Sequence, residues 1–183
     1  MTSWALLPLA LVLLCSSSFC SLGCDLTQDL QEDFLLLNQI STFPLVPCWK
    51  DRTSFNFPKE VMEGSQLQRG NATVIIHEML QQIFTIFSLK AVPAAWNQTQ
   101  FMQLFIGLDR QLQQLEKCLG QNGEWEEPFL ESENLRLILK NYFQGISHYL
   151  QGKKYSHCAW EVVRIEIRRV FLFMSKLTRK LRD

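Results

Sequence analysis

Apolar residues recur every three or four positions along this 183-residue chain, and this helical period constrains the fold more than any other feature. Five stretches carry the period, at about residues 26–40, 73–87, 97–119, 132–150 and 156–181. Side chains that favour a helix N-terminus precede four of them, namely Thr73, Asn97, Ser132 and Ser156. No sustained strand alternation interrupts the pattern. The sequence therefore predicts an all-α fold of five helices.

The connections between these helices differ in length, and the lengths predict a topology. The first connection, which we call the AB loop, runs from about residue 41 to 72 and contains Pro44, Pro47 and Pro58. A long connection lets two neighbouring helices run parallel, whereas a short one makes them antiparallel. The first two helices can therefore run up and the third down, the fourth carries the chain back, and the fifth runs down. This is the up-up-down-down arrangement of a helical cytokine bundle.

The N-terminus resembles a secretory signal peptide. Residues 4–14 form an apolar run, and Ser21 and Gly23 are small residues at the −3 and −1 positions of a cut before Cys24. A charged n-region is missing, but the run is shorter than the roughly 20 residues that span a bilayer. We expect residues 1–23 to be a signal peptide, residues 24–183 to form one helical domain, and the product to be secreted and extracellular.

Four cysteines remain beyond the predicted cut: Cys24, Cys48, Cys118 and Cys158. An even number in a secreted chain indicates two disulfides, with three possible connectivities. Pairing of Cys24 with Cys48 is unfavourable because a helix roughly 24 Å long separates them. The topology instead brings the start of the first helix to the end of the third, and the end of the first to the start of the fifth. It predicts the disulfides Cys24–Cys118 and Cys48–Cys158.

Signals for catalysis and metal binding are weak. His77-Glu78 begins like the zinc motif H-E-x-x-H, but Gln81 stands where the second histidine belongs. The cysteines lack the close spacing of zinc ligands, and the chain carries no nucleophile elbow, phosphate-binding loop or Gly-rich nucleotide fingerprint. We therefore expect no catalytic residue, no metal site, no cofactor and no enzymatic activity.

Charge is balanced overall, with 18 basic and 18 acidic residues, but it is uneven along the chain. Residues 153–183 hold nine Lys/Arg against three acidic residues, a net charge of +6. This basic segment is either a surface for an acidic partner or a solvated helix face. A nucleic-acid partner is not expected in a secreted chain without a binding motif. Direct membrane insertion is not expected either, because the apolar face of the last helix is needed for the core.

Two sequons are candidate glycosylation sites. Asn71 begins Asn-Ala-Thr, and Asn97 begins Asn-Gln-Thr. Both adjoin predicted helix starts, where a glycan would lie on the surface.

Several segments resemble the type I interferon family. They are Cys24-Asp25-Leu26, Cys48-Trp49-Lys50-Asp51-Arg52-Thr53-Ser54-Phe55-Asn56-Phe57-Pro58, His77-Glu78-Met79-Leu80-Gln81-Gln82-Ile83-Phe84, Ala94-Ala95-Trp96 and Tyr155-Ser156-His157-Cys158-Ala159-Trp160-Glu161-Val162-Val163-Arg164. The last segment is similar to the family's signature in its final helix and is highly specific. The resemblance covers essentially all of residues 24–183 and leans toward the alpha, omega and trophoblast branch.

The resemblance implies a monomeric cytokine that bridges two receptor chains and triggers Janus kinase/STAT antiviral and antiproliferative signalling. The residues that match the high-affinity receptor site are Trp49, Lys50, Arg52, Arg164, Ile165, Arg168, Arg169, Leu172 and Phe173. Those that match the low-affinity receptor site are His77, Glu78, Gln81, Phe84, Thr85, Phe105 and Lys140. An alternative for the last helix is that Phe173 belongs to the core and the arginines face solvent.

Some positions depart from the family pattern. Arg168 stands where many members carry an apolar residue, and Gln100 and Asp109 replace common Leu and Tyr on the third helix. These departures leave open a non-signalling or reproductive-tissue interferon-like ligand with altered receptor engagement. Different helical cytokines, with other receptors, are a further alternative.

Overall fold

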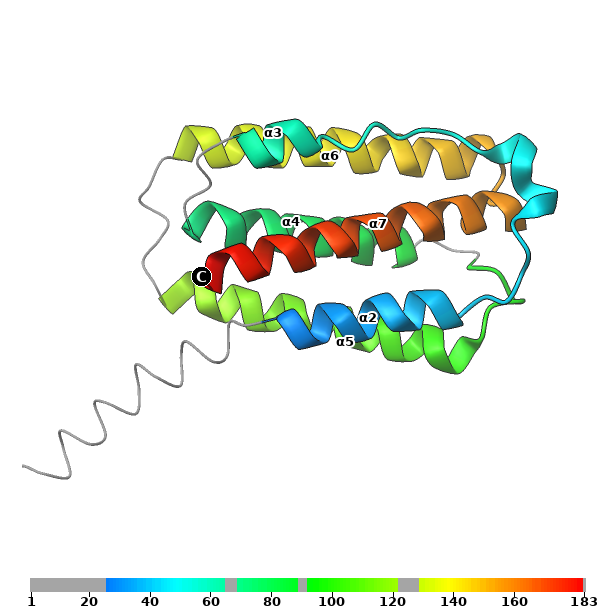
Figure 1. The fold of residues 1–183 in the computed structure, drawn as a ribbon, viewed down its shortest axis with the longest axis horizontal. Helices are drawn as coiled ribbons and strands as arrows, with labels where there is room; N and C mark the ends of the chain where they lie inside the picture. The colour runs from blue at the N-terminus through cyan, green and yellow to red at the C-terminus, as the bar shows by residue number, and fades with distance from the viewer. Residues whose placement is uncertain (1–25, 65–68, 89–91, 122–128, 183) are drawn as a thin grey trace, which may run out of the picture.

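The computed structural model describes residues 26–64, 69–88, 92–121 and 129–182, and within these ranges the regular structure is entirely helical. The elements are α2 (Thr27–Gln39), the 3₁₀ helix η1 (Val46–Asp51), α3 (Lys59–Gly64), α4 (Arg69–Ser88), α5 (Gln98–Gln121), α6 (Phe129–Gly152) and α7 (His157–Arg182) (Figure 1). The five predicted helices correspond to α2, α4, α5, α6 and α7, so the all-α prediction is confirmed.

Two of the predicted helix starts are confirmed by their capping bonds. The Oδ1 atom of Asn97 accepts the Gln100 N–H at 3.1 Å, and the Oγ atom of Ser156 accepts the Ala159 N–H at 3.2 Å. The prediction that Thr73 and Ser132 cap helices was wrong, because α4 begins at Arg69 and α6 at Phe129. In α4 the fully buried Ala72 extends the core-facing stripe, so helix formation continues past Thr73 toward the N-terminus.

The helices run in the predicted directions. Figure 1 shows α2 and α4 running the same way, α5 opposite to them, α6 back again, and α7 opposite to α6. The AB loop passes along α6 on its way from α2 to α4, and it contains the short helices η1 and α3. Helix α7 packs against α2, η1, α4 and α6, so the last helix of the chain lies at the centre of the bundle.

Aromatic side chains fill the core where α4, α5 and α7 meet. Trp96 and Trp160 are almost fully buried, and their rings meet edge to face with centroids 5.7 Å apart. Phe87 of α4 and Phe101 of α5 pack on the same cluster. Each such ring pair contributes about 0.5–1.5 kcal/mol beyond its area burial. The cluster therefore ties α4, α5 and α7 together in the core.

Cys48 and Cys158 form the predicted disulfide. Their Cα atoms lie 5.1 Å apart although 110 residues separate them along the chain, and the bond joins η1 to the start of α7. Cys118 is also disulfide-bonded, while its predicted partner Cys24 and the predicted signal peptide 1–23 lie outside the described residues. None of the described helices is long and apolar enough to cross a membrane.

Candidate functional site

A band of exposed side chains extends from η1 along α7. Trp49 on η1 is 63% exposed, the Lys50 Nζ atom lies 5.4 Å from the centre of its ring, and Arg52 directly after η1 is exposed. Pro47 lies in the first turn of η1, where its fixed φ is compatible with the helix, and the adjacent Cys48 is bonded to Cys158. Large aromatic and arginine side chains on a rigid support are typical of protein-binding hot spots.

The α7 part of this band is basic and apolar. The Arg168 guanidinium lies 5.3 Å from the centre of the Phe34 ring of α2, and burial together with the nearby charge of Arg164 lowers the pKa of Arg168. Arg169 is exposed and pairs with Glu166 at 3.1 Å. We define the η1–α7 surface as Trp49, Lys50, Arg52, Ile165, Arg168, Arg169 and Leu172, of which Ile165 and Arg168 are half-buried and the others exposed.

Two predicted contact residues on α7 lie inside the protein instead. Arg164 is 5% exposed and donates to Glu161 and to the Leu37 carbonyl oxygen. Phe173 is 8% exposed, and its ring packs against Phe57 of the AB loop with centroids 5.0 Å apart. In the free protein Arg164 therefore belongs to a buried polar network and Phe173 packs in the core, and contact of either residue with a partner stays a prediction.

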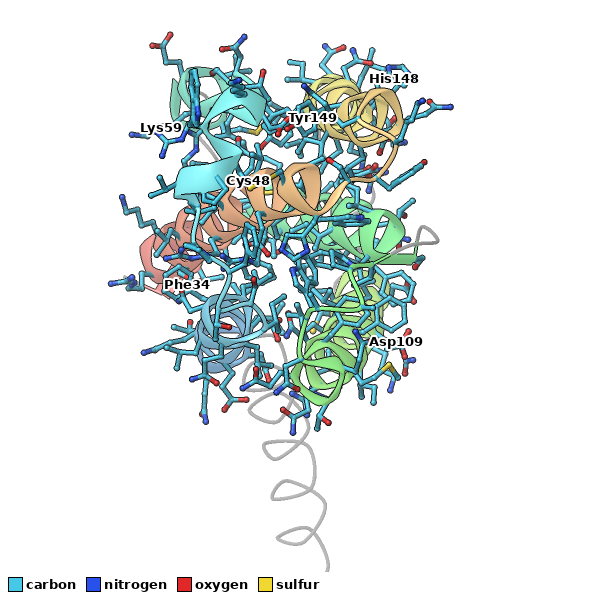
Figure 2. The ribbon with its side chains drawn as sticks, turned by 90° about the vertical axis from the view of Figure 1, so that its right-hand side faces the viewer. Phe34, Cys48, Lys59, Asp109, His148 and Tyr149 are labelled. Atoms are coloured by element: carbon cyan, nitrogen blue, oxygen red, sulfur yellow. A yellow bond between two sulfur atoms is a disulfide. The ribbon has the colours of Figure 1, made fainter. Side chains whose placement is uncertain are left out.

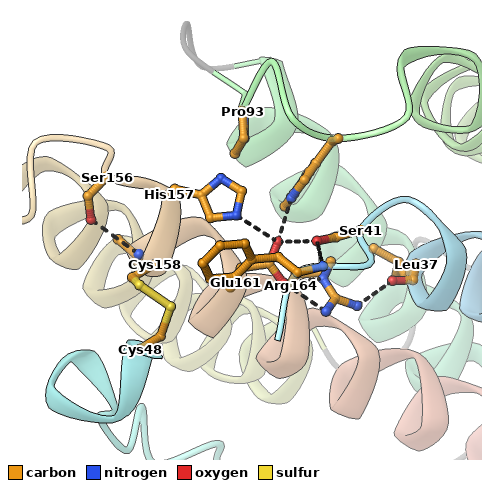
Figure 3. Close-up of polar contacts among 12 residues, drawn as sticks. Leu37, Ser41, Cys48, Pro93, Ser156, His157, Cys158, Glu161 and Arg164 are labelled. Carbon is orange, nitrogen blue, oxygen red and sulfur yellow. Dashed lines mark hydrogen bonds and ion pairs between the residues drawn. A yellow bond between two sulfur atoms is a disulfide. The ribbon is translucent and has the colours of Figure 1, made fainter. Parts of the chain in front are cut away.

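Sequence reasoning missed the buried network around Glu161, which Figure 3 shows. The Glu161 carboxylate is fully buried and accepts Ser41 Oγ at 2.5 Å, Trp96 Nε1 at 2.7 Å, and Arg164 Nε and Nη2 at 3.0 and 2.8 Å. His157 Nε2 lies 3.8 Å from the same carboxylate. The network joins the end of α2, the segment before α5, and α7. The spacing of Glu161 and Arg164 along one helix was the available signal.

The second predicted group lies on α4, α5 and α6. The rings of Phe84 on α4 and Phe105 on α5 stack with centroids 4.5 Å apart, and both are half-buried. His77 Nε2 lies 3.5 Å from Glu116 Oε1. We define the α4–α5–α6 surface as His77, Gln81, Phe84, Thr85, Phe105 and Lys140, each at least partly exposed. The structure brings α4 against both α5 and α6, so one helix links the group.

Glu78, also predicted in this group, is buried in the free protein, and its contact with a partner stays a prediction. It is only 7% exposed and accepts a hydrogen bond from Gln82 Nε2 at 2.8 Å. Its position one residue after His77 turns it toward the bundle, where its side chain is hydrogen-bonded within α4.

The two departures on α5 have different surroundings. Gln100 donates through Nε2 to Gln39 Oε1 of α2 at 3.1 Å, so its side chain is engaged within the bundle. Asp109 is exposed and accepts a hydrogen bond from Gln113. Figure 2, an end view from the side of η1, places Asp109 on α5 and Phe34 on α2 on different sides of the bundle. Asp109 therefore lies away from Phe34 and from the Arg168 guanidinium beside that ring.

A buried carboxyl group joins α2 to α5. Asp33 is 3% exposed, and its Oδ2 atom accepts Gln111 Nε2 at 2.6 Å. Burial is the main cause that raises the pKa of Asp33 to about 7. The groove above it is lined by Leu35, Ile106 and Arg110 among others. Among the residues that the structure describes, no group of three or more His, Cys, Asp or Glu side chains is arranged to hold a metal ion.

The two sequons differ in what the structure describes. Asn97 is exposed, and because its Oδ1 atom caps α5, a glycan on its nitrogen is compatible with the cap. Asn71 falls within the first turn of α4, and its side chain lies outside the described residues.

The protein is a helical bundle with a long crossing connection and a disulfide, and it carries two groups of surface side chains on different helices. These features define the class of helical cytokines. Residues 22–181 match the interferon alpha/beta domain, and the chain belongs to the type I interferon family. The family consists of cytokines without catalytic activity, so the chain is not an enzyme.

Known relatives share nearly the whole chain. Human interferon alpha-16 is 45% identical over 180 residues, covering 96% of this chain and 95% of the relative. Human interferon omega-1 is 46% identical, with 95% and 91% coverage, and interferon tau of Cervus elaphus is 43% identical, with 96% and 92% coverage. The solved structure of zebrafish interferon 2 is similar in fold, with a TM-score of 0.72 at 21% identity, over 82% of this chain and 97% of that one.

Proposed function

We propose that this type I interferon-like cytokine is secreted, acts as a monomer and bridges two cell-surface receptor chains, which brings their Janus kinases together and starts STAT-dependent antiviral and antiproliferative signalling. The observation that carries the proposal is that two groups of exposed or partly exposed side chains lie on different helices of one bundle. A ligand with two such surfaces can hold two partners at a set distance.

The η1–α7 surface is proposed to bind the high-affinity receptor chain. Trp49 and Arg52 are its expected hot spots because exposed tryptophan and arginine dominate many interfaces. Arg164 and Phe173 support this surface from below, through Leu37 and Phe57 respectively. The excess of basic side chains in residues 153–183 favours an acidic receptor face and faster association.

The α4–α5–α6 surface is proposed to bind the low-affinity receptor chain. The stacked pair Phe84 and Phe105 offers a flat, half-buried aromatic centre, and Thr85 and Lys140 supply polar exposed groups beside it. A small aromatic centre with a polar rim suits a weaker contact.

Processing of the N-terminus and glycosylation belong to the same proposal. Residues 1–23 are proposed as the signal peptide, and Asn71 and Asn97 as glycan acceptors. Expression of the full chain in mammalian cells should release a product that begins at Cys24. Treatment with a glycosidase that removes N-linked glycans should lower its mass, and an unchanged mass would reject glycan occupancy.

The secreted product should activate an interferon-response reporter in species-matched cells. Matched cells that lack either type I receptor chain should not respond, because both chains are needed for signalling. A response that persists in either knockout would reject the two-receptor mechanism. The disulfide-reduced protein serves as a control for the folded state.

A second candidate function is a ligand that binds receptor without signalling. Its support is that Gln100 is engaged with Gln39 and that Asp109 places an acidic group on the exposed side of α5. Such a ligand would bind the high-affinity chain and block a known interferon while leaving the reporter silent. Reporter activation by the purified protein alone would exclude it.

A further inference from the structure

Two side chains at the end of α6 bind Asp51 of the AB loop. The Tyr149 hydroxyl of α6 donates to the Asp51 backbone oxygen at 2.6 Å, and Lys153 Nζ pairs with Asp51 Oδ1 at 3.0 Å. The Lys153 N–H donates to the Tyr149 carbonyl at 2.9 Å, so the two side chains emerge one helical turn apart. Main chain and side chain of Asp51 are thus bound by one short segment at the end of α6.

The loop after Asp51 rests on the same face of α6. The Phe55 ring meets the Tyr149 ring edge to face at 5.2 Å, and the Phe57 ring meets the Tyr142 ring at 5.3 Å. Tyr142 and Tyr149 are seven residues apart, which is two turns of helix and therefore the same side. Asn56 turns the loop between these contacts with a φ of 52°.

Two anchored residues, Cys48 and Asp51, precede the exposed Arg52. Before it, Cys48 is bonded to Cys158 at the start of α7. Directly before it, Asp51 is bound to Tyr149 and Lys153, while the Arg52 N–H itself makes only a long hydrogen bond of 3.4 Å to the Trp49 carbonyl. Without the bonds to Asp51, the backbone at Arg52 would have to be ordered by the partner on binding, which weakens affinity.

We propose that Tyr149 and Lys153 are positioning residues for receptor binding: by holding Asp51 they fix the backbone of Arg52 in the orientation that the high-affinity receptor chain recognises. This inference rests on the proposed function. Neither residue is among those matched to a receptor site by resemblance. Burial, with the negative charge of Asp51, raises the pKa of Tyr149 to about 12, so its hydroxyl keeps its proton at physiological pH.

The variants Tyr149→Phe and Lys153→Met remove one bond each while keeping the ring against Phe55 and the aliphatic chain. Tyr155→Phe and Lys154→Met are matched controls, since they make the same chemical changes at the adjoining turn. Lys153→Arg tests rescue, because a guanidinium can still pair with Asp51. Backbone hydrogen exchange of residues 50–57 in the isolated protein measures loop order, and surface-immobilised receptor ectodomain measures the dissociation rate.

We expect Tyr149→Phe and Lys153→Met to exchange amide protons in the loop about fivefold faster. Both variants should dissociate from the high-affinity receptor ectodomain about threefold to tenfold faster than the wild type, with little change in association rate. Lys153→Arg and the two controls should behave like the wild type. In an Arg52→Ala background, the effect of Tyr149→Phe on dissociation should largely vanish, because the residue acts through Arg52.

Unchanged dissociation in a folded Tyr149→Phe variant would overturn the inference. An equal effect in the controls, or a full effect in the Arg52→Ala background, would overturn it too, because each points to a general loss of stability. Wild-type protein that binds while no variant changes the rate would reject this inference alone. Wild-type protein that binds neither receptor chain would reject the proposed function itself.

Discussion

A single buried carboxylate, that of Glu161, joins three segments of this protein through hydrogen bonds. Glu161 places a carboxylate in the core, which is costly unless it is paired and hydrogen-bonded. Ser41, Trp96 and Arg164 supply four donor contacts and so satisfy it from three parts of the fold. Since Arg164 also binds the Leu37 carbonyl, the end of α2 is held at a defined place beside α7.

Glu161→Gln should lower the free energy of unfolding by about 3 to 5 kcal/mol, because it leaves the buried Arg164 charge without a counter-charge. Chemical denaturation followed by circular dichroism measures this. Glu133→Gln is the matched control: Glu133 pairs with Arg136 at the same i,i+3 spacing but is 44% exposed, and its loss should cost at most about 1 kcal/mol. Equal losses in the two variants would contradict the assignment.

Asp33 should make stability depend on pH. Its folded-state pKa of about 7 lies above the unfolded value near 3.8, so the folded state binds the proton more tightly. Stability from this group is therefore complete below about pH 4 and is lost as the pH rises toward 7. Asp33→Asn should remove up to about 1.4 kcal/mol per pH unit of this slope near pH 5 to 6. Parallel curves of unfolding free energy against pH for both proteins would refute it.

Exposure could be predicted from the sequence for some residues of the site but not for others. Trp49 and Arg52 lie in a loop, where exposure follows from the lack of a helical stripe, and both are exposed. Arg164 and Phe173 lie on adjacent stripes of an amphipathic helix that is covered on several sides. A period tells which side chains share a stripe, but it cannot tell how many neighbours cover the helix, so the sequence alone could not decide whether these two side chains are exposed.

The helices themselves follow from the apolar period, and their ends follow less well. Asn97 and Ser156 were found because their side chains cap the backbone, whereas Thr73 and Ser132 carry the same chemistry within helices that begin earlier. Helices η1 and α3 escaped detection inside the AB loop. Each has six residues, too few to show a period, and depends on tertiary contacts such as the Cys48 disulfide.

Gly107 and Gly145 differ in the space around them, so substitutions at these glycines probe how closely the helices pack. A methyl group at Gly107 of α5 would lie 3.0 Å from the Oδ1 atom of Asp33 on α2, and the other carboxyl oxygen of Asp33, Oδ2, accepts a hydrogen bond from Gln111. Gly145 of α6 has open space around it. We expect Gly145→Ala to stabilise the protein by about 0.5–1 kcal/mol through helix propensity, and Gly107→Ala to destabilise it by about 1 kcal/mol despite the same propensity gain. Denaturant midpoints measure both; a stabilising Gly107→Ala would show that α2 yields readily.

The whole molecule separates its two proposed binding surfaces by element. The η1–α7 surface is carried by the AB loop and the last helix, and the α4–α5–α6 surface by the three helices between them. Loop lengths predicted this arrangement, and with it the Cys48–Cys158 bond, because they restrict the direction in which each helix can run. The pairing of Asp33 with Gln111 could not be predicted, since no local pattern shows which faces of α2 and α5 meet.

Substitutions in the two surfaces should act on different receptor chains. Arg52→Ala should weaken binding to the high-affinity ectodomain tenfold or more, about 1.4 kcal/mol. Phe84→Ala should weaken binding to the low-affinity ectodomain about fivefold by disrupting the stack with Phe105. Each variant is the control for the other, and thermal unfolding checks the fold. Loss of binding to both chains in either variant would argue against separate surfaces.

The central place of α7 also governs the order of events as the chain is made. Helix α7 is synthesised last, yet it packs against α2, η1, α4 and α6. Until it emerges, Cys48 lacks the thiol with which it pairs, and Ser41 and Trp96 lack the Glu161 carboxylate that joins them. We therefore expect the apolar faces of the earlier helices to stay partly uncovered until α7 is made, and the bundle to fold as one unit rather than progressively from its N-terminus.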